Sequence, residues 1–218
     1  MTILDRLDSN LTLDETETMV LESVSSMARG ELMDRAADLD RSGDFPWANV
    51  HAINELGLNT MFIPEQYGGN PLSYSCYLAC VREISAACAA TGIVWATNFH
   101  GLKPIIDFGT HEQKERFLPV IAAGGLVSLA ITESGAGSDA TAMTTRFREE
   151  GDDIVITGGK TFITNGDVAD IYLLFGKWEG IDDPKKAISV LVLEKGTAGL
   201  SITGKEDKLG VRASSTAS

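Results

Sequence analysis

Between residues 132 and 139 the chain reads Thr-Glu-Ser-Gly-Ala-Gly-Ser-Asp, a stretch of small and polar residues that could bind a ligand. The apolar run 126–131 before it predicts a buried strand that ends in a loop. The two glycines relax the steric limit on φ, so successive backbone N–H groups can turn toward one point. With the hydroxyls of Thr132 and Ser138, these donors could hold an anion or the polar edge of a ring.

A second polar cluster, residues 160–166 with the sequence Lys-Thr-Phe-Ile-Thr-Asn-Gly, follows on a neighbouring predicted strand. Taken alone, a loop of this kind is more often an ordinary hairpin turn than a binding loop. The second polar cluster on the neighbouring predicted strand makes the binding loop the preferred interpretation. We predict that the two segments converge from adjacent β elements on a shared cleft. Glu133 and Asp139 could suggest a carboxylate pair for acid–base chemistry, but we expect Asp139 to cap the loop and Glu133 to face a neighbouring strand.

Together these two segments closely resemble the flavin-binding signatures of the acyl-CoA dehydrogenase family. Three further blocks resemble motifs of the same family, and all five occur in the family's order across nearly the whole chain. They are Ile-Pro-Glu-Gln-Tyr-Gly-Gly at 63–69, Phe-Gly-Thr-His-Glu-Gln-Lys at 108–114 with Leu-Pro at 118–119, and Lys-Leu-Gly-Val-Arg-Ala-Ser at 208–214.

The resemblance implies FAD as the cofactor and assigns its contacts by position in the motifs. Ser138 is implied to lie also where the acyl-CoA substrate passes, Phe162 against the flavin ring, and Thr164 with its hydroxyl near the flavin N5. Phe162 could instead fill the core of a barrel, and Thr164 could be an ordinary strand residue. The implied flavin contacts are Leu129, Ile131, Thr132, Gly137, Ser138, Phe162, Ile163 and Thr164.

The implied activity is that of an FAD-dependent acyl-CoA dehydrogenase, an oxidoreductase of lipid metabolism, of which this chain would be the front portion. In that family's reaction a carboxylate removes the α proton of an acyl-CoA thioester while the β hydride passes to flavin N5. The family places that carboxylate in a C-terminal domain, so we assign no catalytic residue here and expect the isolated chain to be inactive. Two alternatives stay open: a related acyl-CoA oxidase or flavin monooxygenase, and a catalytically silent fragment or partner subunit.

The resemblance also implies partners for the chain. An electron-transfer flavoprotein is the expected electron acceptor. The expected assembly is a homo- or hetero-oligomer, a tetramer when the C-terminal domain is supplied. Composition adds one exclusion: 31 acidic residues against 18 basic ones give a net charge of -13, which repels polyanions and argues against a nucleic-acid partner. Each lysine late in the chain, Lys160 included, is expected by itself to lie on a solvent-exposed strand face.

At 218 residues and 44% hydrophobic content, the chain is long enough for two domains. No apolar run approaches the length of a membrane span. The acidic residues 1–8 lack the pattern of a secretory signal or a transit peptide, so a cytoplasmic location is expected.

We predict no metal site: the three cysteines are expected as small buried thiols and the three histidines as structural residues. These residues are Cys76, Cys80, Cys88, His51, His100 and His111.

The spacing of apolar residues along the sequence changes near residue 126. Before it, helical spacing dominates, with capping boxes predicted at Thr12 with Glu15 and at Thr110 with Gln113. After it, short β-type segments alternate with turn residues. We therefore predict an α+β fold, with an N-terminal all-α domain over 1–126 and an incomplete β-barrel middle domain over 127–218. Helices are predicted at 47–56, 74–90 and 92–101, and strands at 126–131, 153–157, 161–163, 171–175, 187–193 and 200–202.

Overall fold

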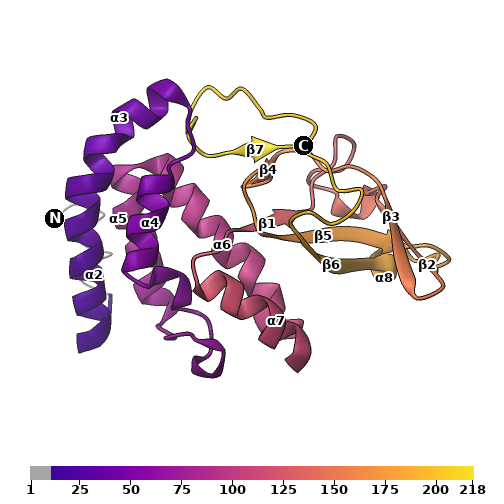
Figure 1. Cartoon of the computed structure of the whole chain (residues 1–218), viewed down its shortest axis with the longest axis horizontal. Coiled ribbons are helices and arrows are strands. Elements are labelled where there is room, and N and C mark those ends of the chain that lie inside the picture. Colours follow the sequence, from indigo (N-terminus) through magenta and orange to yellow (C-terminus); the bar gives the residue numbers. More distant parts are fainter. Residues whose placement is uncertain (1–10) are drawn as a thin grey trace.

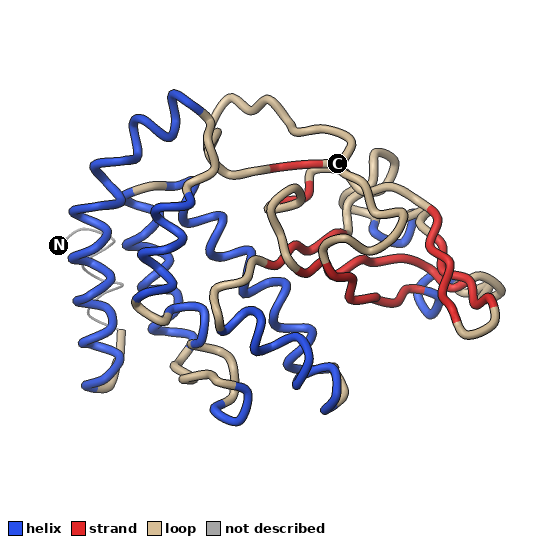
Figure 2. Tube along the Cα trace, viewed as in Figure 1, coloured by secondary structure: helices blue, strands red, loops and turns tan. Residues whose placement is uncertain are grey.

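Residues 11–218 are described by the structure, a computed structural model of the chain. Helices gather at one end of the molecule and strands at the other (Figures 1 and 2). The predicted α+β fold is confirmed, and the mixed sheet of the described residues stays open instead of closing into a barrel. The acidic residues 1–8, on which the expected location partly rests, lie outside the described residues.

The helical half is built around α6, which is apolar nearly all round and buries Val94, Trp95 and Leu102. A helix with so many buried residues belongs at the centre of its bundle, and α6 lies there in Figure 1. The elements in chain order are α2 (Glu15–Met27), the π-helical turn η1 (Ala28–Leu32), α3 (Met33–Ser42), α4 (Trp47–Glu55), the 3-10 turns η2 (Leu58–Thr60) and η3 (Glu65–Tyr67), α5 (Tyr74–Ala87), α6 (Ala89–Phe108) and α7 (His111–Ala122).

Two predicted helix limits are wrong. The helix expected over 74–90 is split, because Cys88 takes an extended conformation with φ of -148° and separates α5 from α6. The helix expected over 92–101 continues to Phe108, so His100 is an exposed residue in the middle of α6 instead of one near a loop. Helix α4 follows its prediction closely, and Gly57 after it adopts a left-handed conformation with φ of 69°.

One predicted capping box is confirmed and the other is displaced. At α7, the Gln113 amide donates to Thr110 Oγ1 at 3.2 Å, and the Thr110 amide donates to Gln113 Oε1 at 2.9 Å. At α2 the reciprocal pair is Asp14 with Glu17, not Thr12 with Glu15. A carboxylate is a strong N-cap, so the helix starts at the acidic residue two positions later.

The sheet is arranged around β5, which is bordered by partners on both edges. Strand β1 pairs in parallel with the first half of β5, β2 pairs in parallel with its end, and β6 runs antiparallel along it. Strand β3 pairs with β2, and β4 with β7 in a separate two-stranded sheet. The elements are β1 (Val127–Ala130), η4 (Ala140–Ala142), β2 (Arg146–Glu150), β3 (Asp153–Thr157), β4 (Ile163–Thr164), β5 (Ile171–Trp178), α8 (Pro184–Ala187), β6 (Ile188–Glu194) and β7 (Thr216–Ala217).

The strand predictions succeed where the sequence is apolar. Strand β3 occupies the predicted residues 153–157, whereas residues 200–202 form no strand. Strand β2 was not predicted, because its sequence Arg-Phe-Arg-Glu-Glu is highly charged. It still belongs to the sheet because Phe147 is fully buried while the charged residues that follow it are exposed.

The two halves of the molecule meet where α6 crosses β1. A Cβ atom built on Gly101 would lie 2.1 Å from Val127 Cγ1, so only glycine permits this approach. The Val127 amide donates to Asn98 Oδ1 at 2.9 Å, and the buried Asn165 donates through Nδ2 to the carbonyls of Val94 and Val127. The β1 strand and the turn after β4 are therefore both fixed to the same helix.

The C-terminal segment connects the halves a second time. After the sheet it passes to the helical end beside α3 and returns as β7 to pair with β4 (Figure 1). Ala213 in this segment is buried in the same hydrophobic cluster as Val24, Leu32 and Trp95 of the helices. We call residues 204–218 the strap. The strap connects the sheet to the helical bundle.

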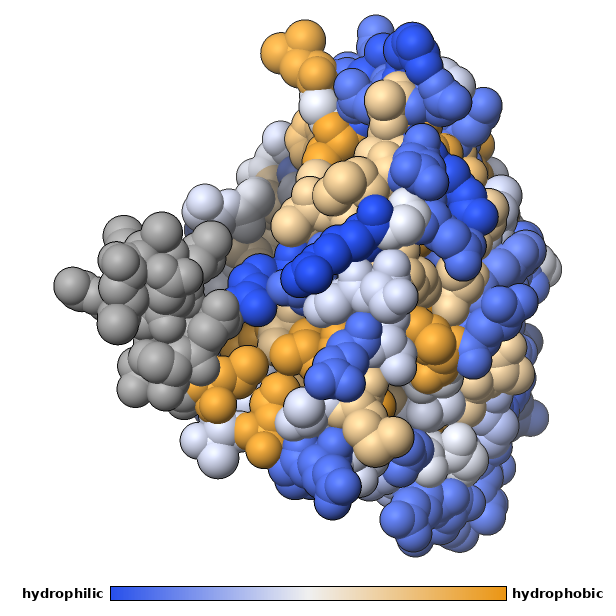
Figure 3. Space-filling model, turned by 90° about the vertical axis from the view of Figure 1, so that its left-hand side faces the viewer, coloured by the Kyte–Doolittle hydropathy of each residue, from blue (hydrophilic) through white to orange (hydrophobic). Residues whose placement is uncertain are grey.

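The helical end of the molecule is covered mostly by hydrophilic residues with smaller apolar groups between them (Figure 3). Exposed apolar side chains of these helices include Met19, Met33 and Leu78. Such single apolar residues are normal on a protein surface. Among residues 11–218, no helix is both long and apolar enough to span a lipid bilayer.

Candidate functional site

The two polar segments lie side by side and are joined by hydrogen bonds. The Thr161 amide donates to the Thr132 carbonyl at 2.9 Å. Ser128 Oγ on β1 donates to the Thr164 carbonyl at 2.6 Å. These contacts confirm that the two segments come together from adjacent β elements, and the shared cleft stays a prediction.

The first segment forms a tight turn closed by two reciprocal backbone hydrogen bonds of 3.1 Å between Glu133 and Ala136. Neither Gly135 nor Gly137 adopts a positive φ, so the expected use of glycine's conformational freedom is wrong. Their role is to leave the surface bare, because a Cβ atom built on either would meet no atom within 4 Å. Backbone donors of this loop are therefore accessible to an approaching group.

Several of these donors have no partner within the described chain. The exposed residues Ser134, Gly135, Gly137 and Ser138 donate no hydrogen bond through their amides to any residue of 11–218. The hydroxyl of Ser138 makes no such bond either. A polar ligand would find here a group of solvated donors that the fold itself does not use.

The second segment presents its residues on two faces. Phe162 is 61% exposed and adopts a φ of 58°, a rare conformation for a bulky residue. Thr164, the second residue of the two-residue strand β4, is half-buried. Ile163 is buried and lines a cavity of the sheet. The expectation that Phe162 could fill a barrel core is wrong, since its ring is mostly in solvent.

Leu129 and Ile131 lie at the helical side of β1. Leu129 packs against the hydrophobic cluster that contains Leu102 and Phe117, and Ile131 is half-buried two residues further on. Thr132 is half-buried at the start of the loop. Leu129 and Ile131 are thus beside the loop, and much of the Leu129 side chain contributes to packing between helices and sheet.

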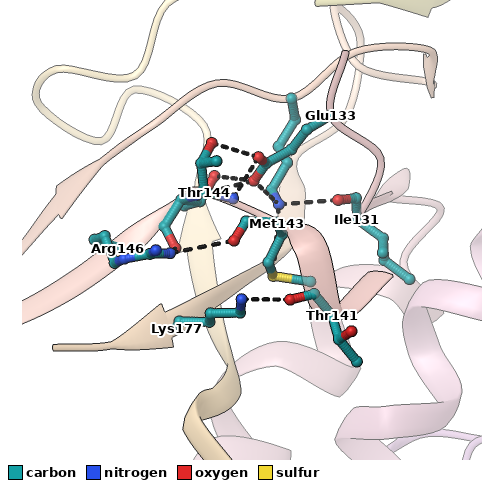
Figure 4. A network of polar contacts seen from close by, with 9 residues as sticks. Ile131, Glu133, Thr141, Met143, Thr144, Arg146 and Lys177 are labelled. Carbon is teal, nitrogen blue, oxygen red and sulfur yellow. Dashed lines mark hydrogen bonds and ion pairs between the residues drawn. The ribbon is translucent and has the colours of Figure 1, made fainter. Parts of the chain in front are cut away.

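Glu133 is held as a carboxylate by five hydrogen bonds (Figure 4). Thr144 donates to Oε2 through its amide and hydroxyl, both at 2.6 Å, and Thr145 donates to Oε1 at 2.9 and 2.6 Å. Lys160 Nζ donates to Oε1 at 2.8 Å. Burial alone would raise the pKa of Glu133, but the bonds from Lys160, Thr144 and Thr145 outweigh it and hold the pKa well below its usual value. Glu133 is therefore a structural anion, as expected.

Lys160 corrects the expectation of a solvated lysine. Its side chain is only 7% exposed, and its Nζ also donates to the Ile131 carbonyl at 2.9 Å. Sequence reasoning named Lys160 as part of a motif without assigning it this contact. The only signal was a lysine directly before a predicted buried strand, with a glutamate in the loop that the strand adjoins.

Asp139 caps the turn that follows the loop, as predicted. Its carboxylate accepts from the Thr141 amide at 3.0 Å and from the Thr141 hydroxyl at 2.5 Å. The hydroxyl of Thr141 holds the pKa of Asp139 below its ordinary value. Lys177 Nζ donates to the Thr141 carbonyl and fixes the same turn to β5, as Figure 4 shows. The two carboxylates serve separate structural tasks, so they form no acid–base pair.

The inner face of the open sheet encloses a cavity of about 470 Å³. Ile156, Ile163, Tyr172 and Leu193 line it, together with Lys160 at one end. Ile163 is one of its lining residues, whereas Phe162 and Thr164 are not. No residue of 132–138 lines it, so it is not a cleft shared by the two polar segments.

The cysteines and histidines lie away from these segments. All three cysteines are buried thiols, as predicted, and burial raises the pKa of Cys80. His111 receives a hydrogen-bond contact from the Tyr67 hydroxyl at 2.9 Å and pairs with Glu115 at 3.1 Å, which is a structural role. Within residues 11–218, no group of three or more His, Cys, Asp or Glu side chains could hold a metal ion.

Comparison with known protein families assigns both halves of the chain. Residues 14–125 match the model of the acyl-CoA dehydrogenase N-terminal domain, and residues 128–218 match that of the acyl-CoA dehydrogenase middle domain. The chain belongs to the acyl-CoA dehydrogenase family. The resemblance on which the implied fold rests is thereby confirmed.

Individual relatives agree with this membership. The mitochondrial short-chain specific acyl-CoA dehydrogenase of Mus musculus is 41% identical over 207 residues, which cover 94% of this chain and 50% of the mouse protein. The solved butyryl-CoA dehydrogenase of Megasphaera elsdenii has a TM-score of 0.89 at 29% identity, covering 95% of this chain and 56% of its own. This chain spans about half the length of the curated relatives it matches.

A third comparison concerns a redox system. A chain solved in work on the electron transferring flavoprotein of Acidaminococcus fermentans has a TM-score of 0.89 at 33% identity. The match covers 95% of this chain and 55% of the other.

Proposed function

We propose that this chain forms the flavin-contacting front portion of an FAD-dependent acyl-CoA dehydrogenase. Family membership of both halves supports the reaction class, and the named relatives that match are acyl-CoA dehydrogenases. Because the chain spans about half of those relatives, the activity proposed is that of the longer protein. The domain limits at residues 126 and 127 are part of this proposal.

The chemistry of the loop donors fits a flavin. An isoalloxazine has a polar edge of carbonyl and nitrogen groups, and the dinucleotide adds a pyrophosphate, so both require hydrogen-bond donors. The exposed, unpartnered amides of Gly137 and Ser138 supply such donors, and the Thr132 and Ser138 hydroxyls add two more.

The observation that carries the proposal is the conformation of Phe162. A phenylalanine with φ of 58° and 61% of its surface exposed is both strained and poorly packed. Such outliers cost on the order of 1–3 kcal/mol and persist where function requires them. An aromatic ligand stacked on Phe162 would bury this ring, and the hydroxyl of Thr164, two residues further on, is the proposed donor to it.

Each predicted contact has a distinct part in the proposed site. Thr132, Gly137 and Ser138 would bind the polar edge, Phe162 and Thr164 the ring, and Leu129, Ile131 and Ile163 would hold the two segments against their cores. Ser138 is proposed as well to contact the acyl-CoA substrate. FAD bound there would accept a hydride from the β-carbon of the acyl thioester.

The proton of that reaction needs a different group. A base must be positioned at the α-carbon and free to accept a proton. Glu133 is saturated by five donors, and Asp139 caps its own turn. Neither carboxylate is therefore proposed as the base, and no catalytic residue is assigned among the described residues.

Partners follow from the same proposal. An acyl-CoA is the proposed substrate, and an electron-transfer flavoprotein the proposed acceptor, in line with the redox system of the Acidaminococcus chain. Assembly into an oligomer, a tetramer for the longer protein, stays a prediction. A cytoplasmic location stays a prediction as well, and the mouse relative is named as a mitochondrial protein.

Titration of the purified chain with FAD tests the proposal. We expect flavin fluorescence to be quenched and the visible absorption band to sharpen, because Phe162 would stack on the ring in a less polar environment. The Phe162→Ala variant should fold normally, since the ring is exposed, and should weaken FAD binding by about tenfold. Ile154→Ala, an exposed apolar residue of β3, is the matched control. An unaltered chain that leaves FAD fluorescence unchanged would contradict the proposal.

A further inference from the structure

We propose that Glu133 and Lys160 are a positioning pair that holds the two segments of the flavin site in register. The inference rests on the function proposed above and adds to it two residues that make no contact with the ligand. Its evidence is a closed set of buried polar contacts between the segments.

The pair is almost completely removed from solvent. The side chains of Glu133 and Lys160 are 5% and 7% exposed, and their Nζ to Oε1 distance is 2.8 Å. Another ion pair that joins distant elements, Arg116 with Glu194, has side chains that are 62% and 48% exposed. Both pairs join a cationic side chain to a glutamate, one buried and the other exposed, so the second serves as a control.

Each charged group is saturated by directional contacts. Glu133 accepts from the amides and hydroxyls of Thr144 and Thr145 at the entrance to β2. Lys160 donates to Glu133 and to the Ile131 carbonyl, where β1 ends, and lies 4.0 Å from the Met143 sulfur. The pair therefore connects the end of β1, the start of β2 and the second segment.

These contacts form a short cycle with the backbone. Lys160 bonds to both Ile131 and Glu133, and the next residue, Thr161, donates its amide to Thr132. Phe162 follows directly in the chain. A displacement of either segment relative to the other would break the contacts at Ile131, Thr132 and Glu133. The loop donors and the Phe162 ring are therefore fixed relative to each other.

Stability alone does not account for such a pair. Desolvation of two charges offsets most of their attraction, and apolar residues of similar volume often serve stability as well or better. What apolar residues cannot supply is the directional geometry of seven hydrogen bonds. A site that must place free amides beside an aromatic ring needs that geometry.

The experiment uses four variants of the full chain: Glu133→Gln, Lys160→Met, the double variant, and Lys160→Arg. Amide hydrogen exchange without ligand is measured for peptides that cover 131–138 and 160–165. FAD affinity is then measured by fluorescence titration under the same conditions. Glu194→Gln is the control for charge removal, and Val24→Ala, buried in the helical cluster, is the control for general destabilisation.

We expect Glu133→Gln and Lys160→Met each to raise exchange in both segments and to lower FAD affinity, each by about tenfold. The double variant should lose less than the sum of the single losses, because the two residues act on each other. Lys160→Arg should recover part of the affinity. Glu194→Gln should leave exchange in the two segments and FAD affinity unchanged. Val24→Ala should raise exchange in the two segments no more than in the rest of the chain and should leave FAD affinity unchanged.

Unchanged exchange of the second segment in folded Glu133→Gln would overturn the inference. Increased exchange with unchanged FAD affinity would also overturn it, because the register would then not matter to the ligand. Absence of FAD binding by the unaltered chain would overturn the proposed function instead, and the exchange data would still decide whether the pair couples the segments. If Glu133→Gln does not fold, Thr144→Val removes one donor from Glu133 at an exposed residue and repeats both measurements.

Discussion

A buried carboxylate keeps its charge only when enough donors surround it, and Glu133 meets this condition. Its two oxygens accept from two amides, two hydroxyls and an ammonium group. Each donor favours the charged form, so together they overcome the cost of burial. This is why Glu133, although it lies inside the proposed flavin-binding motif, supports the proposed site and takes no part in its chemistry.

The first prediction concerns acid stability. The pKa of Glu133 in the folded chain lies below its ordinary value of 4.5, so the unfolded state binds a proton more readily. The stabilisation is therefore fully present above about pH 5 and is lost as the pH falls below the ordinary value toward the folded pKa. The Glu133→Gln/Lys160→Met double variant lacks this group. Its free energy of unfolding should fall less between about pH 5 and pH 3 than that of the unaltered chain.

Urea unfolding at a series of pH values measures this difference. Glu17 and Asp167 also have lowered pKa values, through hydrogen bonds with Ser73 and with Lys205 and Ser215, and they contribute equally to both proteins. Only the difference between the two curves reports on Glu133. Parallel curves over the whole acid range would show that its carboxylate has the same pKa in both states.

Among the elements, the crossing of α6 over β1 decides where the first segment ends. Glycine at position 101 allows helix and strand to touch, with Val127 Cγ1 only 2.1 Å from where a Cβ would be. Val127 is β-branched and stiff, so it cannot easily turn away. Gly101→Ala should therefore destabilise the chain by about 1–3 kcal/mol, despite the better helix propensity of alanine.

Thermal unfolding of Gly101→Ala tests this contact. Adding Val127→Ala removes the opposing methyl group, so the second change should cost less in the Gly101→Ala background than alone. Gly30→Ala is the matched control, because a Cβ there meets nothing within 4 Å in the π-helical turn. Equal stability of Gly101→Ala and the unaltered chain would mean that β1 does not depend on this approach.

The helices and strands also show which parts of the fold could be predicted from the sequence. Periodicity located α4, α7 and β3 because apolar residues dominate the buried faces there. It missed β2, whose single buried anchor is Phe147 among charged residues, and β7, whose two residues depend on pairing with distant β4. The convergence of the two polar segments was predictable, since neighbouring strands carry them. The Glu133–Lys160 contact was not, because it depends on which side chains face inward at each strand end.

At the scale of the whole molecule, the strap decides whether the two halves act as one. Ala213 is 1% exposed in the helical cluster, and four residues later Ala217 pairs with Ile163. The second segment of the site is therefore tied to the helical bundle as well as to β1. Unfolding of the two halves should be a single cooperative event as long as this connection holds.

Ala213→Asp should break that connection. A carboxylate in this apolar cluster has no partner, so the expected loss is on the order of 3 kcal/mol or more. Leu209→Asp is the matched control in the same segment, since Leu209 is fully exposed and its replacement should change stability by no more than about 0.5 kcal/mol. Tryptophan fluorescence can report on each half separately, because Trp95 belongs to the helical cluster and Trp178 ends β5.

Single-tryptophan versions of both variants would be unfolded thermally and followed by fluorescence. With Ala213→Asp, the Trp95 and Trp178 transitions should shift to lower temperature and no longer coincide, because the sheet would lose its second attachment to the helices. With Leu209→Asp they should coincide as in the unaltered chain. If Ala213→Asp keeps one common transition at the original temperature, the strap is not what couples the halves, and the crossing of α6 over β1 alone carries that role.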